Sequence, residues 1–389
     1  MREYHAISAD SHLEIPIDRW VHRIPAQYRD QAPKRIKLEG GGEAHAVEGG
    51  PMAVEPKRME KARSWPRGGS FDANPGTGPP EQRLREQDMD GIDAEILYPG
   101  TSGPNLYRAI KDDVAYRAVV HAYNEWLAEE YCSVAPDRLL GLGLIPEMKV
   151  RGAIEELECC ARMGLKGVML NAFPNGEMYP TPEDDEFWAE AVRINMPVTA
   201  HIWFHHGAGL GNNYTGPLFQ YERRPEGPIK SSMSDPIRRF IGPFGVRAAR
   251  EAVRLIFAGV FDRFPTLQVY FAETQVGWIP QWLEHMDDSY QRNRGWAEEL
   301  FGLAPLTRRP SEYVKEHCLW GFGNNPVGVE LRHHIGVDRI LWYTDFPHTG
   351  SDWPHSNETL DRNFAGVPDE ERYQMVVGNA VRFFHLDET

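Results

Sequence analysis

The feature that most limits the fold of this chain is a repeated alternation of short apolar segments with segments of helical periodicity. Most of the short runs of β-branched and apolar residues lead into a longer stretch whose apolar residues lie three and four positions apart. This order is typical of parallel strands joined by crossover helices. We predict eight strands, at residues 4–10, 94–98, 139–145, 167–171, 197–203, 267–273, 317–322 and 339–345.

Eight such units in one chain favour a closed (β/α)8 barrel of the TIM type over an open sheet. A doubly wound open sheet is the alternative, but no G-x-G-x-x-G follows the first predicted strand and the sequence contains no P-loop motif. We therefore expect an α/β chain with a (β/α)8 barrel. The periodicity predicts helices over residues 108–131, 150–163, 184–195, 246–263 and 278–293.

Two long stretches interrupt the alternation of strands and helices. Residues 30–82 are dense in glycine, proline and charge, and residues 205–245 form a second interruption after the fifth strand. Loops of this length in a compact enzyme are usually lids, binding loops or interface arms. We expect one catalytic domain over 1–389 with insertions at 30–82 and 205–245, and we regard 30–82 as a candidate arm of a homodimer.

Composition excludes several classes of partner. A formal charge of -15 argues against a nucleic-acid surface, which needs clustered lysine and arginine. The longest apolar runs, such as "LIFAGVF", are far shorter than the roughly 20 residues that span a bilayer, and no signal segment is apparent. The four cysteines show no C-x-x-C spacing and read as reduced. We expect a cytoplasmic protein that acts on a small molecule and binds neither membrane nor nucleic acid.

Polar side chains recur where the predicted strands end. Asp10 and His12 close the first strand, His201 lies in the fifth, Glu273 ends the sixth, and Asp345 ends the eighth. Each alone has an ordinary explanation, as a turn residue, a core histidine or a helix cap. A barrel brings these strand ends around one mouth, where two imidazoles and several carboxylates would leave costly unpaired charge without a cation. Such nitrogen and oxygen ligands suit Zn²⁺ best, and Mn²⁺ or Fe²⁺ acceptably.

Other polar residues could line the same mouth and bind substrate. Asn171 ends the fourth strand, His205 and His206 follow the fifth, and His348 follows the eighth. For the three histidines, an exposed position on a loop is an equal alternative. His348, in "DFPH", is the one whose substitution is most informative.

Three stretches resemble the amidohydrolase superfamily, and more narrowly its amidohydrolase-related (amidohydrolase 2) branch, which includes enzymes like aminocarboxymuconate semialdehyde decarboxylase. They are "ISADSHLEIPIDRW", "LIFAGVFDRFPTLQVYFAETQVGWIPQWLEHMD" and "RILWYTDFPHTGSDWP". The resemblance implies a metal held by four residues of this chain. These are Asp10, His12, His201 and Asp345.

The chain departs from the common pattern of that family at two positions. Many members carry H-x-H in the first strand, where this chain has Asp10-Ser11-His12, a change that favours a harder cation such as manganese. Members often have a histidine late in the sixth strand, where this chain has Glu273. Glu273 is therefore a candidate acid-base group, an anchor behind the ligands or a ligand to another metal, and a helix cap is the structural alternative.

We interpret the chain as a mononuclear metal-dependent hydrolase of a small, carboxylated or aromatic substrate. In this interpretation the metal activates a water, and Asp345 takes its proton and delivers it to the leaving group. The first alternative is a metal-dependent, non-oxidative decarboxylase, which the family resemblance equally allows. The second is a binding or assembly protein in which the metal serves structure alone.

Overall fold

The computed structural model describes residues 2–37, 43–47, 52–54, 75–100, 103–177, 179–201, 204, 245–348 and 350–387. Nearly all of the predicted insertion at 205–245 lies outside the described residues, as do His205 and His206. Parts of the insertion at 30–82 are described and carry regular structure.

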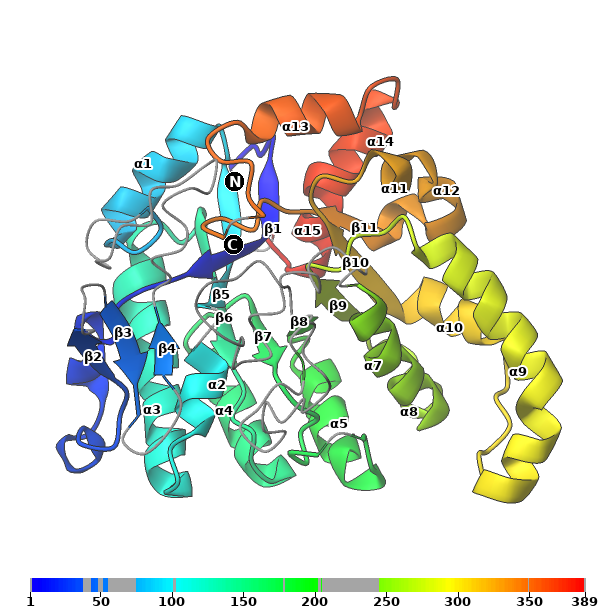
Figure 1. Cartoon of the computed structure of the whole chain (residues 1–389), viewed down its shortest axis with the longest axis horizontal. Helices are drawn as coiled ribbons and strands as arrows, with labels where there is room; N and C mark the ends of the chain where they lie inside the picture. Colours follow the sequence, from blue (N-terminus) through cyan, green and yellow to red (C-terminus); the bar gives the residue numbers. More distant parts are fainter. Residues whose placement is uncertain are drawn as a thin grey trace, which may run out of the picture.

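Eight parallel strands form the centre of the molecule, and they neighbour one another in chain order (Figure 1). They are β1 (Ile7–Leu13), β5 (Ala94–Pro99), β6 (Leu139–Leu144), β7 (Gly167–Leu170), β8 (Val198–His201), β9 (Val269–Ala272), β10 (Cys318–Phe322) and β11 (Ile340–Trp342). Every residue in these strands is buried, as expected of a parallel sheet covered by helices. All eight predicted strands are present, with ends shifted by a few residues.

The first strand meets the segment that follows the last strand, and this contact closes the barrel. The amide of His12 donates to the carbonyl of Phe346 at 2.7 Å, and the amide of Asp345 donates to the carbonyl of Asp10 at 3.0 Å. Beside them, Ser8 Oγ accepts a hydrogen bond from the amide of Thr344 at 2.9 Å. The predicted (β/α)8 barrel is confirmed.

Helices lie outside the strands (Figure 1). Those that match predictions are α3 (Asp113–Trp126), α4 (Val150–Arg162), α5 (Asp185–Arg193), α7 (Val246–Phe257), α8 (Val260–Arg263) and α9 (Ile279–Phe301). The others are α1 (Pro80–Asp90), α2 (Gly103–Arg108), α10 (Pro310–His317), α11 (Pro326–Glu330), α12 (Arg332–Ile335), α13 (Ser356–Asn363), α14 (Asp369–Tyr373) and α15 (Asn379–Phe383). Among the described residues, no helix is both long enough and apolar enough to cross a membrane.

Two predicted helices differ from the observed ones for local reasons. The helix predicted over 108–131 begins at Asp113, because the Asp112 side chain accepts hydrogen bonds from the amides of Val114 and Ala115 and caps the helix there. The helix predicted over 246–263 is divided at Gly259, whose φ of 69° is left-handed and ends α7.

The first insertion contains a small antiparallel sheet, which the sequence analysis did not predict. Its strands are β2 (Lys34–Lys37), β3 (Glu43–Ala46) and β4 (Met52–Val54), in that spatial order. Each has only three or four residues, so an alternating pattern is too short to recognise against the glycine-rich sequence between the strands. The predicted insertion at 30–82 therefore contains regular structure in this part, and α1 also begins inside it.

A buried polar network ties α3 and α4 to β6. Glu156 accepts hydrogen bonds from His121 Nδ1 at 3.0 Å and from Asn124 Nδ2 at 2.8 Å. Asn124 also donates to the carbonyl of Leu144 and accepts from its amide. The hydrogen bond with Glu156 raises the pKa of His121 above its ordinary value. This network therefore makes part of the stability of the barrel wall depend on pH.

We predict that His121→Gln removes a pH-dependent part of the stability. A raised pKa in the folded state stabilises the protein below the unfolded value of about 6.5, and the gain disappears as pH rises through the folded pKa. Because the His121 side chain is 36% exposed, solvent screening limits the difference to less than about 1 kcal/mol. Urea unfolding from pH 5.5 to 8.5 should show that the difference in free energy of unfolding between wild type and variant becomes smaller as pH rises. A difference that stays constant with pH, or the same trend in the exposed control His355→Gln, would contradict this prediction.

Candidate metal centre

Three buried side chains meet at the carboxyl ends of β1 and β8. Asp10 and His12 are two positions apart on β1 and therefore point to the same face, toward His201 at the end of β8. His12 Nε2 lies 3.3 Å from Asp10 Oδ1, and His201 Nε2 lies 3.6 Å from Asp10 Oδ2. Their donor atoms all lie within 4.8 Å of one another. This spacing matches a set of ligands around one cation.

The donor atoms of this cluster are buried without conventional partners. Among the described residues, Asp10 Oδ1 and Oδ2, His12 Nε2 and His201 Nε2 are all buried and have no hydrogen-bond partner. Burial alone would raise the pKa of Asp10, but the two histidines hold it below its usual range. Buried polar atoms without partners are costly, and a divalent cation would satisfy all four at once. The residues present therefore fit a metal ion.

The orientation of His12 also suits a metal ligand. Its Nδ1 lies 3.0 Å from the carbonyl oxygen of Pro99, which can only accept a hydrogen bond. Nδ1 therefore carries a hydrogen that it donates to this carbonyl, and Nε2 faces the cluster. Metal-binding histidines are commonly fixed in this way by a backbone carbonyl.

Asp345 and Glu273 extend the cluster on two sides. Asp345 Oδ1 lies 3.6 Å from His12 Nε2, and Glu273 Oε2 lies 3.6 Å from His201 Nε2. Both residues have left-handed backbone conformations, with φ of 56° at Asp345 and 58° at Glu273. Glu273 directly follows β9, and Asp345 lies shortly after the end of β11. This conformation is strained for residues other than glycine and tends to occur at functional sites.

Glu273 lies at the more open side of the cluster, with 22% of its side chain exposed. Desolvation and the neighbouring Asp345 together raise its pKa to about 8, although His201 opposes the shift. A carboxyl group in this setting holds a proton much more readily than an ordinary glutamate. Glu273 is thus suited to proton transfer, as the sequence analysis proposed among its alternatives.

His348 joins the site from the loop after β11, where it links two carboxylates. Its Nδ1 lies 2.7 Å from Asp345 Oδ1, and its Nε2 lies 2.9 Å from Glu14 Oε1. Its ring centre is 4.1 Å from that of His12. Burial lowers the pKa of His348, but Asp345 and Glu14 outweigh that effect and raise it well above its ordinary value.

Glu14 was not singled out from the sequence, although a signal for it exists. Asp10, His12 and Glu14 alternate along the end of the first strand and the residue after it, so the period of two places all three on one face. His348 was predicted as a substrate-binding residue, and the structure brings it to the cluster. Its contact with substrate remains a prediction.

The other candidates have different outcomes. Asn171 follows β7, is buried, and donates a hydrogen bond to Glu147, so its proposed contact with substrate also remains a prediction. Burial raises the pKa of Glu147. His205 and His206 lie outside the described residues.

Arg83 supports the site from behind and was also missed. It lies on α1 with 1% exposure, and its Nε and Nη2 donate to Glu95 at 2.6 and 3.1 Å. Its Nη1 donates to the carbonyl of His12 at 3.0 Å, and Nη2 donates to that of Phe346 at 3.2 Å. One guanidinium therefore binds the backbone of a candidate ligand and of the residue after Asp345.

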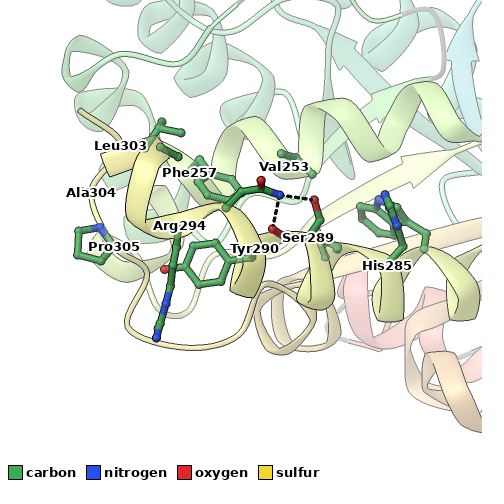
Figure 2. Close-up of a pocket in the computed structure, with 13 residues that line it drawn as sticks. Val253, Phe257, His285, Ser289, Tyr290, Arg294, Leu303, Ala304 and Pro305 are labelled. Carbon is green, nitrogen blue, oxygen red and sulfur yellow. Dashed lines mark hydrogen bonds between the residues drawn. The ribbon is translucent and has the colours of Figure 1, made fainter. Parts of the chain in front are cut away.

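A separate cavity of about 290 Å³ lies between α7, α9 and the segment after α9 (Figure 2). Figure 2 shows Phe257, Tyr290 and Leu303 on its wall, with Arg294 at its edge. Its lining contains none of the candidate metal ligands. We therefore place the chemistry at the cluster of strand ends and not in this cavity.

Comparison with known proteins identifies the family of the chain. The family model described as Amidohydrolase matches residues 17–386, a span that includes His201 and Asp345 and begins after Asp10 and His12. Gamma-resorcylate decarboxylase of Rhizobium sp. (strain MTP-10005) is 27% identical over 320 residues, covering 79% of this chain and 87% of the relative. The 2-amino-3-carboxymuconate-6-semialdehyde decarboxylase of Dictyostelium discoideum is 23% identical over 317 residues, covering 79% and 77%.

Solved structures share the fold along the whole chain. An amidohydrolase from Mycobacterium avium subsp. paratuberculosis K-10 has a TM-score of 0.71 at 17% identity, with coverage of 99% of this chain and 100% of that one. A 5-carboxyvanillate decarboxylase from Novosphingobium aromaticivorans DSM 12444, complexed with manganese and a nitrobenzoic acid, has a TM-score of 0.66 at 19% identity, covering 98% and 96%. The chain belongs to the amidohydrolase family, in the branch of enzymes like aminocarboxymuconate semialdehyde decarboxylase.

Proposed function

We propose that this enzyme is a metal-dependent, non-oxidative decarboxylase of a small carboxylated aromatic compound. The observation that carries the proposal is the buried cluster of Asp10, His12 and His201, whose donor atoms lack partners in the described structure. The relatives that match most of the chain are named decarboxylases, which supports the decarboxylase alternative better than the hydrolase interpretation of the sequence. Hydrolysis remains the competing reaction, because the same site could activate a water.

Four side chains would hold the metal in this proposal. They are Asp10, His12, His201 and Asp345. When bound, a divalent cation supplies a Lewis acid that can hold the substrate carboxylate and a neighbouring oxygen. Two carboxylates among four ligands are compatible with manganese as well as zinc, and the identity of the metal is part of the proposal.

Decarboxylation replaces a carbon–carboxylate bond with a carbon–hydrogen bond, so the site must deliver one proton to the ring carbon. In this proposal Glu273 delivers the proton, which its contact with His201 and its partly open side chain support. Asp345 accepts a hydrogen bond from His348, which fixes the orientation of its carboxylate as a ligand. In the competing hydrolysis, Asp345 would take the proton of the water.

We predict about one equivalent of a divalent transition metal per chain. His12→Ala and His201→Ala should each lose most of it, because each removes a nitrogen ligand from a site with few others. Elemental analysis of purified protein checks this, with His355→Ala as the matched control, since His355 is exposed and paired with Glu358. Full metal content in both ligand variants would refute the assignment.

We predict that Asp345→Asn lowers turnover by at least about a thousandfold while much of the metal remains. The amide keeps the shape of the side chain but loses its charge, and the other three ligands are unchanged. Steady-state kinetics and metal analysis on the same samples check this. Activity within about tenfold of wild type would remove Asp345 from the mechanism.

We predict that Glu273→Gln lowers turnover by about two to four orders of magnitude with metal content unchanged, because glutamine cannot donate the proton. The assay uses gamma-resorcylate, the acid named for one relative, in D₂O. Wild type should release carbon dioxide or bicarbonate and place deuterium on the carbon that loses the carboxylate. Turnover of the variant within about tenfold of wild type would remove Glu273 as the proton donor. Consumption of the acid by wild type without release of carbon dioxide or bicarbonate would overturn the proposal.

A further inference from the structure

We propose that Glu14 is a positioning residue of the metal centre, which acts through His348 to fix the orientation of Asp345. The inference rests on the proposed metal site and not on the identity of the substrate. It concerns Glu14, His348 and Asp345, which connect the end of β1 to the loop after β11. These side chains cross the seam of the barrel, which is the contact between β1 and the segment that follows β11.

The distances define an unbroken chain of hydrogen bonds. Asp345 Oδ1 accepts from His348 Nδ1 at 2.7 Å, and Glu14 Oε1 accepts from His348 Nε2 at 2.9 Å. Both ring nitrogens are engaged, so the imidazole cannot flip without breaking a contact with a carboxylate. A side chain held at both ends presents a fixed donor to Asp345, and outer partners of this kind commonly orient metal-binding carboxylates.

The Glu14 carboxylate occupies space that is open because residue 100 is a glycine. A β-carbon added at Gly100 would lie 2.9 Å from Glu14 Oε2 and 2.7 Å from the carbonyl oxygen of Leu13. Gly100 directly follows Pro99, whose carbonyl orients His12. The carbonyl of Pro99 at the end of β5 therefore fixes His12. The next residue, Gly100, leaves space for the Glu14 carboxylate because it has no side chain.

Charge complementarity supports the same arrangement. His348 lies between the carboxylate groups of Asp345 and Glu14, and each of its ring nitrogens faces one carboxylate oxygen. The ring is only 16% exposed and Glu14 is 14% exposed, which strengthens their interaction relative to a surface pair. A pair of this kind restrains Asp345 more than solvent would.

If Glu14 is a positioning residue, its effect on metal binding must pass through His348, whereas a purely local role of Glu14 would not depend on His348. We would compare Glu14→Ala, His348→Ala and the double variant by chelator competition for Mn²⁺ in the absence of substrate, and by kcat and KM. We expect His348→Ala to weaken Mn²⁺ binding by about 10- to 100-fold. We expect a smaller loss for Glu14→Ala, of about three- to tenfold, and a double variant no weaker than His348→Ala alone.

Two further variants sharpen the comparison. Glu14→Gln should retain most of the affinity, because its amide oxygen still accepts from His348 Nε2. Glu358→Gln is the matched control, because Glu358 pairs with His355 at 3.2 Å on the exposed surface. If Glu14→Ala fails to fold, Glu14→Asp replaces it, since the shorter side chain withdraws the carboxylate from His348 while keeping the charge.

The result that would overturn the proposal is wild-type Mn²⁺ affinity and turnover in Glu14→Ala, or losses that multiply in the double variant. Multiplying losses would show that Glu14 acts on the centre independently of His348. Because Mn²⁺ affinity is measured without substrate, the coupling can be established or refuted even if the chain does not decarboxylate any aromatic acid.

Discussion

The buried ion pair between Arg83 and Glu95 supports the backbone on both sides of the contact that closes the barrel. Its guanidinium also binds the carbonyls of His12 and Phe346, which lie on the first strand and just after the last. Removing one member of a fully buried pair typically costs about 3 to 5 kcal/mol, because the remaining charge has no partner. Arg83 therefore both stabilises the contact that closes the barrel and fixes the backbone of a candidate metal ligand, His12.

Much of the fold was predictable because the strands and most helices of a barrel leave strong local patterns. Runs such as 139–145 and 317–322 are apolar and bounded by turns, and most runs of this kind precede a segment of helical periodicity. These local patterns are enough to predict the strands. The division of the helix at Gly259 was not predictable, since a glycine inside a periodic segment is often tolerated. The strands of the small sheet are too short to show a period. The residues of α1 are mostly charged or polar, so this segment shows no apolar periodicity that would predict a helix.

The site was predictable only where it follows from the ends of strands. Asp10, His12 and His201 could be grouped because a barrel brings strand ends together, and the structure brings them within reach of one ion. Glu14 and Arg83 act through contacts across the seam, between segments far apart in the sequence. No local pattern distinguishes Arg83 from an exposed helical arginine, so its burial emerges only from the tertiary structure.

The seam also determines when the centre can form during synthesis of the chain. Ser8 and Thr344, whose hydroxyls lie 3.0 Å apart there, are separated by 336 positions, so one side leaves the ribosome long before the other. A nascent chain that already contains Asp10 and His12 lacks the strand that brings Asp345 beside them. In the proposed site, the complete set of metal ligands would therefore form only after translation, and a chain that stops before β11 would present Asp10 and His12 without Asp345.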